Sequence, residues 1–134
     1  MAGITDLGQL LRNLEPTARD GEFVYVNMPG PRLPATLSPE ATIRENEGLT
    51  VVLRRADADA VSLAYDVTLA WITLSVPSSL EAVGLTAAFS TALGQAGISC
   101  NVLAGFYHDH LLVPVAQRDA ALAVLRELAA GKGR

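Results

Sequence analysis

The sequence has few cysteines, no excess of basic residues and no long apolar run, and these absences exclude several classes of protein. It has one cysteine in 134 residues, so no disulfide can form within the chain, and this suits a reducing compartment. Its formal charge is −4, whereas a protein that binds nucleic acid needs a basic face. No apolar run approaches the roughly 20 residues of a membrane-spanning helix. We therefore expect a cytoplasmic protein that binds neither nucleic acid nor a membrane.

The N-terminal stretch MAGITDLGQLLRNLEP lacks the basic start and the small-residue cleavage site of a signal peptide. Half of the residues are apolar, which is enough for a sizeable core in a chain of this length. These features predict an acidic globular protein made of one domain or of two small intertwined ones.

The usual sequence signatures of catalysis are also missing. Ser78 and Ser79 are not framed by the Gly-x-Ser-x-Gly pattern of a nucleophile elbow, and no glycine-rich loop carries the lysine of a phosphate-binding site. We expect Ser78 and Ser79 to cap a helix, with Glu81 favoured by the helix dipole. We therefore predict no catalytic residues, no cofactor and no enzymatic activity.

The only cysteine and both histidines lie within eleven positions, in the stretch GISCNVLAGFYHDHLLVP. His108 and His110 are two residues apart, so on a strand they would project from one face, with Cys100 on a neighbouring strand. A structural zinc ion takes four protein ligands and a catalytic one takes three and a water. We expect ordinary strand residues at a hairpin and no bound metal; a metal site is the alternative.

The order of the hydrophobic patterns predicts an α+β protein. In the second half, apolar residues alternate in AWITLSVP and recur at helical spacing over residues 81–96, and we expect Gly97 to be the C-terminal cap of that helix. Two short strands, SCNVLAG and HDHLLVPV, and a last helix follow. This βαββα run lacks one strand of a split βαβ unit. The first half supplies a short helix at 4–14, a strand at 22–28, a proline-rich loop, a hairpin turning at Glu45 to Gly48, and a brief helix in ADADAV. We expect a strand from one half to complete the sheet of the other.

The segment VPSSLEAVGLTAAFSTALGQAGISCNVLAG resembles the ACT domain, a ferredoxin-like regulatory module whose pattern is roughly PGVLARI…LAEAGINI. Gly84 and Leu85 match the glycine and its apolar follower, Leu93 matches the late leucine, and residues 96–98 match AGI. Val83 departs from the usual proline. The likeness covers residues 48–128 well. It is closer still to small stand-alone proteins with two ACT-like halves, related to the ACT domains of aspartate kinases and of cytosolic arginine sensors.

The resemblance implies both a fold and a function. The fold would be the α+β ferredoxin-like ACT fold, with two intertwined halves (1–66 and 67–134), antiparallel sheets and helices on one face. The function would be that of a non-enzymatic regulatory protein that binds an amino acid or a similar small metabolite. A ligand-free dimerisation or interaction module that acts on a partner protein is the alternative. ACT-type sheets commonly extend edge to edge, so we also expect a homodimer.

The resemblance places a ligand at the loop that opens the helix over residues 81–96. Gly84 would let a ligand approach the backbone, and the first amides of a helix suit a carboxylate. Asn101 on the adjoining strand can both donate and accept hydrogen bonds. The alternatives are that Gly84 only permits close packing and that Asn101 only satisfies a strand edge. The predicted ligand-binding residues are Ser78, Ser79, Val83, Gly84, Leu85, Asn101 and Val102.

Overall fold

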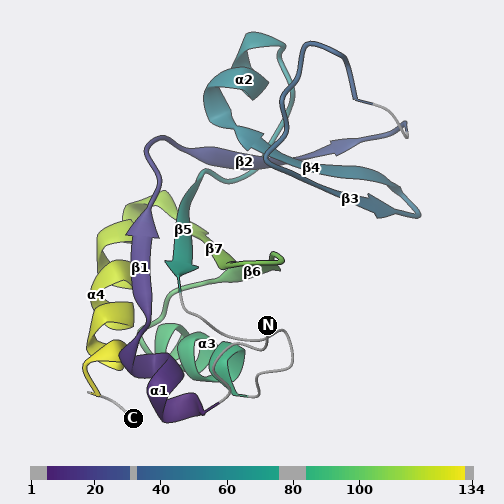
Figure 1. Ribbon diagram of the computed structural model, residues 1–134. Helices are drawn as coiled ribbons and strands as arrows, with labels where there is room; N and C mark the ends of the chain where they lie inside the picture. The colour runs from purple at the N-terminus through teal and green to yellow at the C-terminus, as the bar shows by residue number, and fades with distance from the viewer. Residues whose placement is uncertain (1–5, 31–32, 76–83, 132–134) are drawn as a thin grey trace. The chain divides into compact units, whose positions relative to one another are not determined.

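The computed structural model describes residues 6–30, 33–75 and 84–131. The chain divides into two compact units (Figure 1). Each unit has its own hydrophobic core. Unit 1 consists of Met1–Arg19 together with Ala70–Arg134, and unit 2 consists of Asp20–Leu69. The boundary expected at residue 66 does not coincide with the division into these two units, and it stays a prediction.

The described residues of unit 1 form four strands of a sheet and three α-helices. Its strands lie in the order β1-β5-β7-β6, and β5 begins at the last residue of unit 2. The βαββα run expected from the sequence is confirmed, with a single 3₁₀ turn (η1) added before the last helix. The elements are α1 (Leu7–Arg12), β1 (Glu15–Ala18), β5 (Leu69–Ser75), α3 (Leu85–Gln95), β6 (Asn101–Ala104), β7 (Asp109–Pro114), η1 (Val115–Gln117) and α4 (Arg118–Ala129).

Strand β1 supplies the missing strand of this sheet. It pairs antiparallel with β5, from Glu15 opposite Ser75 to Ala18 opposite Ile72, so a segment of the first half does complete the sheet of the second. The sequence pattern predicted a helix that ends before Pro16 and no strand at this position. A four-residue strand is too short to show alternation, and Pro16 is tolerated because β1 lies at the edge of the sheet.

The helices of unit 1 pack on one face of its sheet. Alternate residues of β5 and β7 point into this core, among them Ile72 and Leu111, and Phe89 of α3 and Leu125 of α4 close it from the other side. Each of these four side chains is fully buried, which stabilises the fold by about 1.5–3 kcal/mol per side chain. The arrangement of antiparallel strands with helices on one face is the α+β architecture that the sequence predicted.

Helix α3 begins four residues later than the periodicity of residues 81–96 indicated. Gly84 has φ = +93°, a left-handed conformation that cannot continue a right-handed helix, so the first helical residue is Leu85. Gly84 is therefore the N-cap. Ser78 and Ser79 lie outside the described residues, so the capping role expected for them stays a prediction.

The end of α3 agrees with the sequence prediction. Gly97 has φ = +75°, its amide donates to the Gly94 carbonyl at 3.0 Å, and the Ile98 amide donates to the Leu93 carbonyl at 2.9 Å. These two bonds form a Schellman motif, which satisfies the last carbonyls of the helix. Ile98 is also buried in the core of unit 1, so the motif anchors the chain as it leaves the helix.

Unit 2 is a three-stranded antiparallel sheet with one short helix. Its strands lie in the order β3-β4-β2, and valines of β2 and β4 pack against Ala58 of the helix. The hairpin turn at Glu45 to Gly48 and the brief helix are confirmed. Gly48 has φ = +147°, and a Cβ there would lie 2.5 Å from the Met28 carbonyl oxygen, so only glycine fits. The elements are β2 (Phe23–Met28), β3 (Ala41–Glu45), β4 (Gly48–Arg54) and α2 (Arg55–Ala60).

The proline-rich stretch between β2 and β3 forms neither helix nor strand over its described residues, 29–30 and 33–40, as expected. Among the helices described, none is long and apolar enough to cross a membrane.

Candidate functional site

The predicted ligand site lies in unit 1, around the start of α3. Ser78, Ser79 and Val83 fall outside the described residues. Gly84 and Leu85 open the helix, and the Leu85 side chain is buried in the core with only 4% of its surface exposed. Leu85 can therefore offer its backbone amide to a ligand, whereas its side chain fixes the helix to the sheet.

Gly84 is held in place by packing as well as by its backbone conformation. A Cβ at this position would lie 3.2 Å from Cδ2 of Leu7, so the first turn of α1 covers one side of the glycine. The first bond of the helical ladder runs from the Ala88 amide to the Gly84 carbonyl at 2.9 Å. The amides of residues 85–87 precede this ladder and have no acceptor within the helix.

An apolar groove of about 480 Å³ runs along α3 beside Gly84. Its walls include Leu7 of α1, Ala88 and Ala92 of α3, and Leu128 of α4. Of the predicted site residues that the structure describes, Gly84 lines this groove, and Leu85, Asn101 and Val102 do not. The volume lies within the range of small-molecule sites, and the walls suit an apolar group.

Asn101 and Val102 occupy the two faces of strand β6. Val102 lies opposite Leu111 and packs against the core, whereas Asn101 lies opposite Leu112 and is exposed on the other face. The Gly105 amide donates to the His108 carbonyl at 2.8 Å, so Gly105 and His108 form a hydrogen-bonded pair. Along an antiparallel ladder, hydrogen-bonded and non-hydrogen-bonded pairs alternate. By that alternation the backbone amide and carbonyl of Val102 point to the outer edge of the sheet, where β6 is the last described strand.

The histidines take up different positions. His110 lies in β7, and His108 is exposed and precedes that strand, so the expectation that both lie on a strand is wrong for His108. The register ends at Asp109 opposite Ala104, and the two-residue turn Phe106–Tyr107 leaves His108 outside the ladder proper. The two imidazole rings are nevertheless near each other, with centroids 6.4 Å apart.

His110 belongs to a polar cluster on the sheet face opposite the helices. The indole N–H of Trp71 lies 3.2 Å from Nδ1 of His110 and 3.2 Å from the Thr73 hydroxyl oxygen, which is itself 3.1 Å from Nδ1. An indole nitrogen can only donate, so Nδ1 accepts and the neutral ring carries its proton on Nε2. The guanidinium of Arg19 lies over the Trp71 ring, 5.0 Å from its centroid.

Burial lowers the pKa of His110 below its usual value, and the neighbouring His108 and Arg19 lower it further, whereas Asp109 raises it. The neutral imidazole is therefore favoured in the folded chain. Cys100 is half-buried, and burial raises the pKa of its thiol. Among the described residues, no three His, Cys, Asp or Glu side chains gather closely enough to hold a metal ion.

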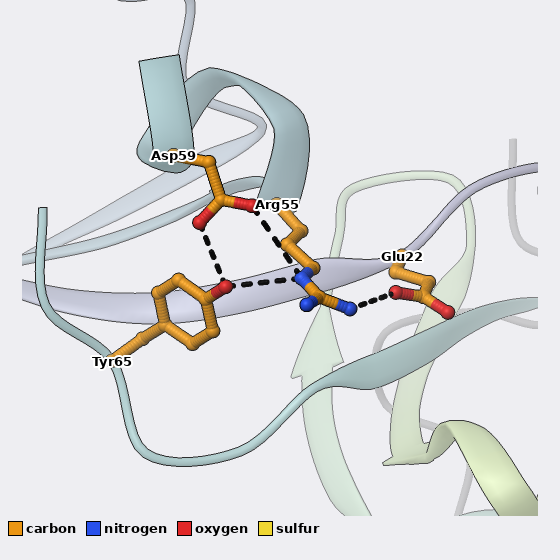
Figure 2. A network of polar contacts seen from close by, with 4 residues as sticks. All are labelled: Glu22, Arg55, Asp59 and Tyr65. Carbon is orange, nitrogen blue, oxygen red and sulfur yellow. Dashed lines mark hydrogen bonds and ion pairs between the residues drawn. The ribbon is translucent and has the colours of Figure 1, made fainter. Parts of the chain in front are cut away.

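Unit 2 carries a charged network that sequence analysis did not identify as a cluster (Figure 2). The Arg55 guanidinium donates to Glu22 at 2.8 Å and to the Tyr65 hydroxyl at 3.0 Å, and Tyr65 donates to Asp59 at 2.8 Å. The side-chain hydrogen bond to Glu22 and then that to Tyr65 raise the pKa of Arg55. The adjacent Arg54 and Arg55 are the only sign of this network in the sequence, because Glu22, a partner of Arg55, lies 33 positions away.

The chain is similar in sequence to known protein families. Residues 2–70 and residues 66–127 match two family models, each described as an ACT domain. Comparison with curated proteins gave no match.

Solved structures show a similar fold over most of the chain. A Vibrio cholerae protein of unknown function, called a possible transport protein, is 42% identical, with a TM-score of 0.84 over 96% of this chain and 99% of its own. The ligand-free regulatory subunit of aspartate kinase from Thermus thermophilus is 9% identical, with a TM-score of 0.61 over 84% of this chain and 95% of its own. Aspartate kinase from Clostridium acetobutylicum is 10% identical, with a TM-score of 0.62 over 86% of this chain and 34% of its own.

Proposed function

The chain belongs to the ACT domain family, and on that premise we propose that it is a non-enzymatic regulatory protein of the cytoplasm that binds an amino acid or a similar small metabolite at the start of α3. The observation that carries the proposal is the left-handed Gly84, which starts α3 and also lines the apolar groove along that helix. A carboxylate at the first amides of the helix would be favoured by their N–H groups and by the helix dipole.

The groove indicates which amino acids to expect. Its described walls are formed by leucine, alanine and glycine, with Thr91 and Gln95 as the polar exceptions. An apolar ligand side chain would lose water on entering it, whereas a charged side chain would lose hydration without gaining a partner. Aliphatic amino acids are therefore the expected ligands, ahead of acidic and basic ones.

The remaining predicted residues have distinct roles in this proposal. The outward backbone groups of Val102 would bind the ligand or the facing edge of a second subunit, and the exposed Asn101 amide would choose among ligands from the outer face of β6. Ser78, Ser79 and Val83 would complete the loop before Gly84. The boundary between the two ACT repeats would lie at residue 66, where the two matched regions meet.

A thermal-shift panel of the twenty amino acids tests the proposal. A ligand at 100 times its dissociation constant should stabilise the fold by about 2.7 kcal/mol, which appears as a melting shift of several degrees. Asn101→Ala should reduce the shift, whereas Glu127→Gln, an exposed change in α4 outside the groove, should leave it unchanged. If no amino acid at millimolar concentration moves the melting point of the wild-type protein, the proposal fails.

One observation favours the alternative function, a ligand-free interaction module. Leu7 already covers one side of Gly84, so the glycine has a packing role that needs no ligand. In that case Phe106 and Tyr107, exposed to 77% and 79% at the tip of the β6–β7 hairpin, would be candidates for contact with a partner protein. The same panel separates the two functions, because an interaction module would not respond to any amino acid.

A further inference from the structure

We propose that unit 2 carries a second binding site, for a small organic cation such as an amine or a guanidinium compound, in a pocket beside strand β2. The pocket has a volume of about 400 Å³ and is lined by Tyr25 and Asn27 of β2, Thr50 of β4, and Tyr65 and Asp66 of the segment after α2. It shares no residue with the site proposed at the start of α3. Its size is that of a site for a small molecule.

The walls of this pocket are fixed by the sheet. Asn27 and Thr50 lie directly opposite each other in the β2–β4 ladder, so their side chains share one face. Tyr25 is two residues from Asn27 and lies on the same face. Val26, which lies between Tyr25 and Asn27, and its partner Val51 are buried in the core of unit 2. A ligand would therefore meet side chains held in place by the sheet beneath them.

The Tyr65 ring forms another fixed wall. Its hydroxyl donates to Asp59 and accepts from Arg55, at 2.8 and 3.0 Å, and neither of those residues lines the pocket (Figure 2). With its hydroxyl held by these partners, Tyr65 has mainly the aromatic ring to offer to a ligand in the pocket. Aromatic faces attract organic cations through the ring quadrupole.

Acidic groups supply the countercharge for a cation. The exposed carboxylate of Asp66 lines the pocket, and the Thr50 hydroxyl donates to the carboxylate of Glu45, which brings a second acidic group to its margin. Among the described residues, no lysine or arginine lines this pocket. An anion or a carboxylate-bearing ligand would be repelled there.

The distribution of charge along the chain also favours a positively charged ligand in unit 2. Unit 2 contains eight acidic and four basic residues, and unit 1 contains six of each, so the whole formal charge of −4 belongs to unit 2. An excess of negative charge on a small unit raises the local concentration of cations. A smaller hollow of about 250 Å³ in unit 2 differs, because its Arg55 and Glu22 already pair with each other.

Calorimetry with agmatine and arginine tests the site. The two ligands share a guanidinium group, but arginine adds a carboxylate that Asp66 would repel. We expect agmatine to bind the full-length protein at low ionic strength and arginine to bind at least about fivefold more weakly, the factor for one repulsive contact of about 1 kcal/mol. Raising the salt concentration should weaken agmatine binding, because the contact is partly exposed.

Two matched variants locate the site. Asp66→Asn should weaken agmatine binding by about fivefold or more, and Asp57→Asn should not, since Asp57 is a carboxylate of α2 outside the pocket. Tyr65→Ala should weaken binding further than Tyr65→Phe, which keeps the ring. If Asp66→Asn and Asp57→Asn weakened agmatine binding equally, the attraction would come from the overall negative charge of unit 2 and not from this pocket, and the proposal would be overturned. The absence of any agmatine binding would overturn it too.

The outcome is independent of the function proposed for unit 1. Agmatine has no carboxylate for the amides of α3, so Asn101→Ala should leave its binding unchanged. A response of the wild-type protein to aliphatic amino acids but not to agmatine would sink this inference alone, and the reverse result would sink only the amino-acid site.

Discussion

At the scale of single residues, Gly84 is constrained by both its backbone and its packing. Its φ is +93°, and a Cβ at this position would approach Leu7 to 3.2 Å, so both features act against any side chain. We expect Gly84→Ala to lower the free energy of unfolding by about 1–2 kcal/mol, the cost of a left-handed conformation for an L-residue. Urea denaturation measures this change.

Gly94 provides the matched control in the same helix. A Cβ there would meet no atom within 4 Å, and its backbone is helical. Gly94→Ala should therefore raise the free energy of unfolding by about 0.5–1 kcal/mol. If the two substitutions changed stability in the same direction, the special role of Gly84 would be refuted.

His110 makes stability depend on pH. Burial lowers its pKa in the folded chain, with His108 and Arg19 acting in the same direction and Asp109 against them. The unfolded chain therefore binds more protons, so stability is retained in full above the usual histidine pKa, 6.5. It is lost as the pH falls from that value toward the lower pKa of the folded state. The effect should be modest because His110 is only half-buried.

Thermal melts between pH 7.5 and 5 check this expectation, with the fluorescence of Trp71, the only tryptophan, as the probe. His110→Gln can still accept from the indole but does not titrate, so its melting point should fall less on acidification than that of the wild-type protein. His108→Gln, at an exposed position, should largely retain the wild-type dependence. The same slope in all three proteins would rule out His110 as the titrating group.

At the scale of elements, strand β6 is the edge through which a homodimer would form. By the alternation of the ladder, the amide of Ala104 points outward and that of Leu103 points toward His110 of β7. Proline removes an amide, and it is tolerated where that amide faces away from the sheet. Ala104 is also exposed, so its substitution disturbs little packing.

We therefore expect Ala104→Pro to yield a folded monomer of 14.1 kDa, while the wild-type protein sediments as a dimer. Leu103→Pro should instead destabilise the fold, because it removes a bond of the β6–β7 ladder. Sedimentation together with circular dichroism separates the two effects. A wild-type monomer at micromolar concentration, or a dimer that survives Ala104→Pro, would exclude pairing through β6.

At the scale of the whole molecule, unit 1 depends on a segment that lies far from its other elements in the sequence. Leu10, Leu11 and Leu14 are all buried in its core, and each contributes about 1.5–3 kcal/mol. Together they are comparable to the net stability of about 5–15 kcal/mol of a typical domain. Deleting residues 1–19 should therefore leave unit 1 without cooperative thermal unfolding.

Unit 2, by contrast, should be dispensable for the fold of unit 1. The Arg19 amide donates to the Trp71 carbonyl at 2.9 Å, so the two ends of unit 1 are neighbours and a short glycine-serine linker can replace residues 20–69. We expect this shortened protein to unfold cooperatively by circular dichroism. If it does not, unit 1 is not an independent folding unit.

The sequence by itself determined the local elements of this protein. The alternation in AWITLSVP, the helical spacing that buries Phe89 and Leu93, and the stop at Gly97 all depend on neighbours within a few residues, and each element was found. The family pattern around Gly84 was likewise local. Turn chemistry at Gly48 could be predicted for the same reason, since a glycine with positive φ marks the hairpin whatever surrounds it.

Only the tertiary structure shows which residues distant in the sequence pair or form hydrogen bonds with each other. Strand β1 is visible only because β5, from the other half of the chain, provides its partner, and Pro16 hides it from any propensity argument. The helix was predicted to start at residue 81, but the left-handed backbone of Gly84 makes Leu85 the first residue of α3. Likewise, His110 carries its proton on Nε2 because Trp71 lies across the sheet, and Arg55 meets Glu22 through the pairing of β2 with β4. The spacing of apolar residues reflects the local backbone geometry, whereas these contacts depend on which distant segments pack together in the folded chain.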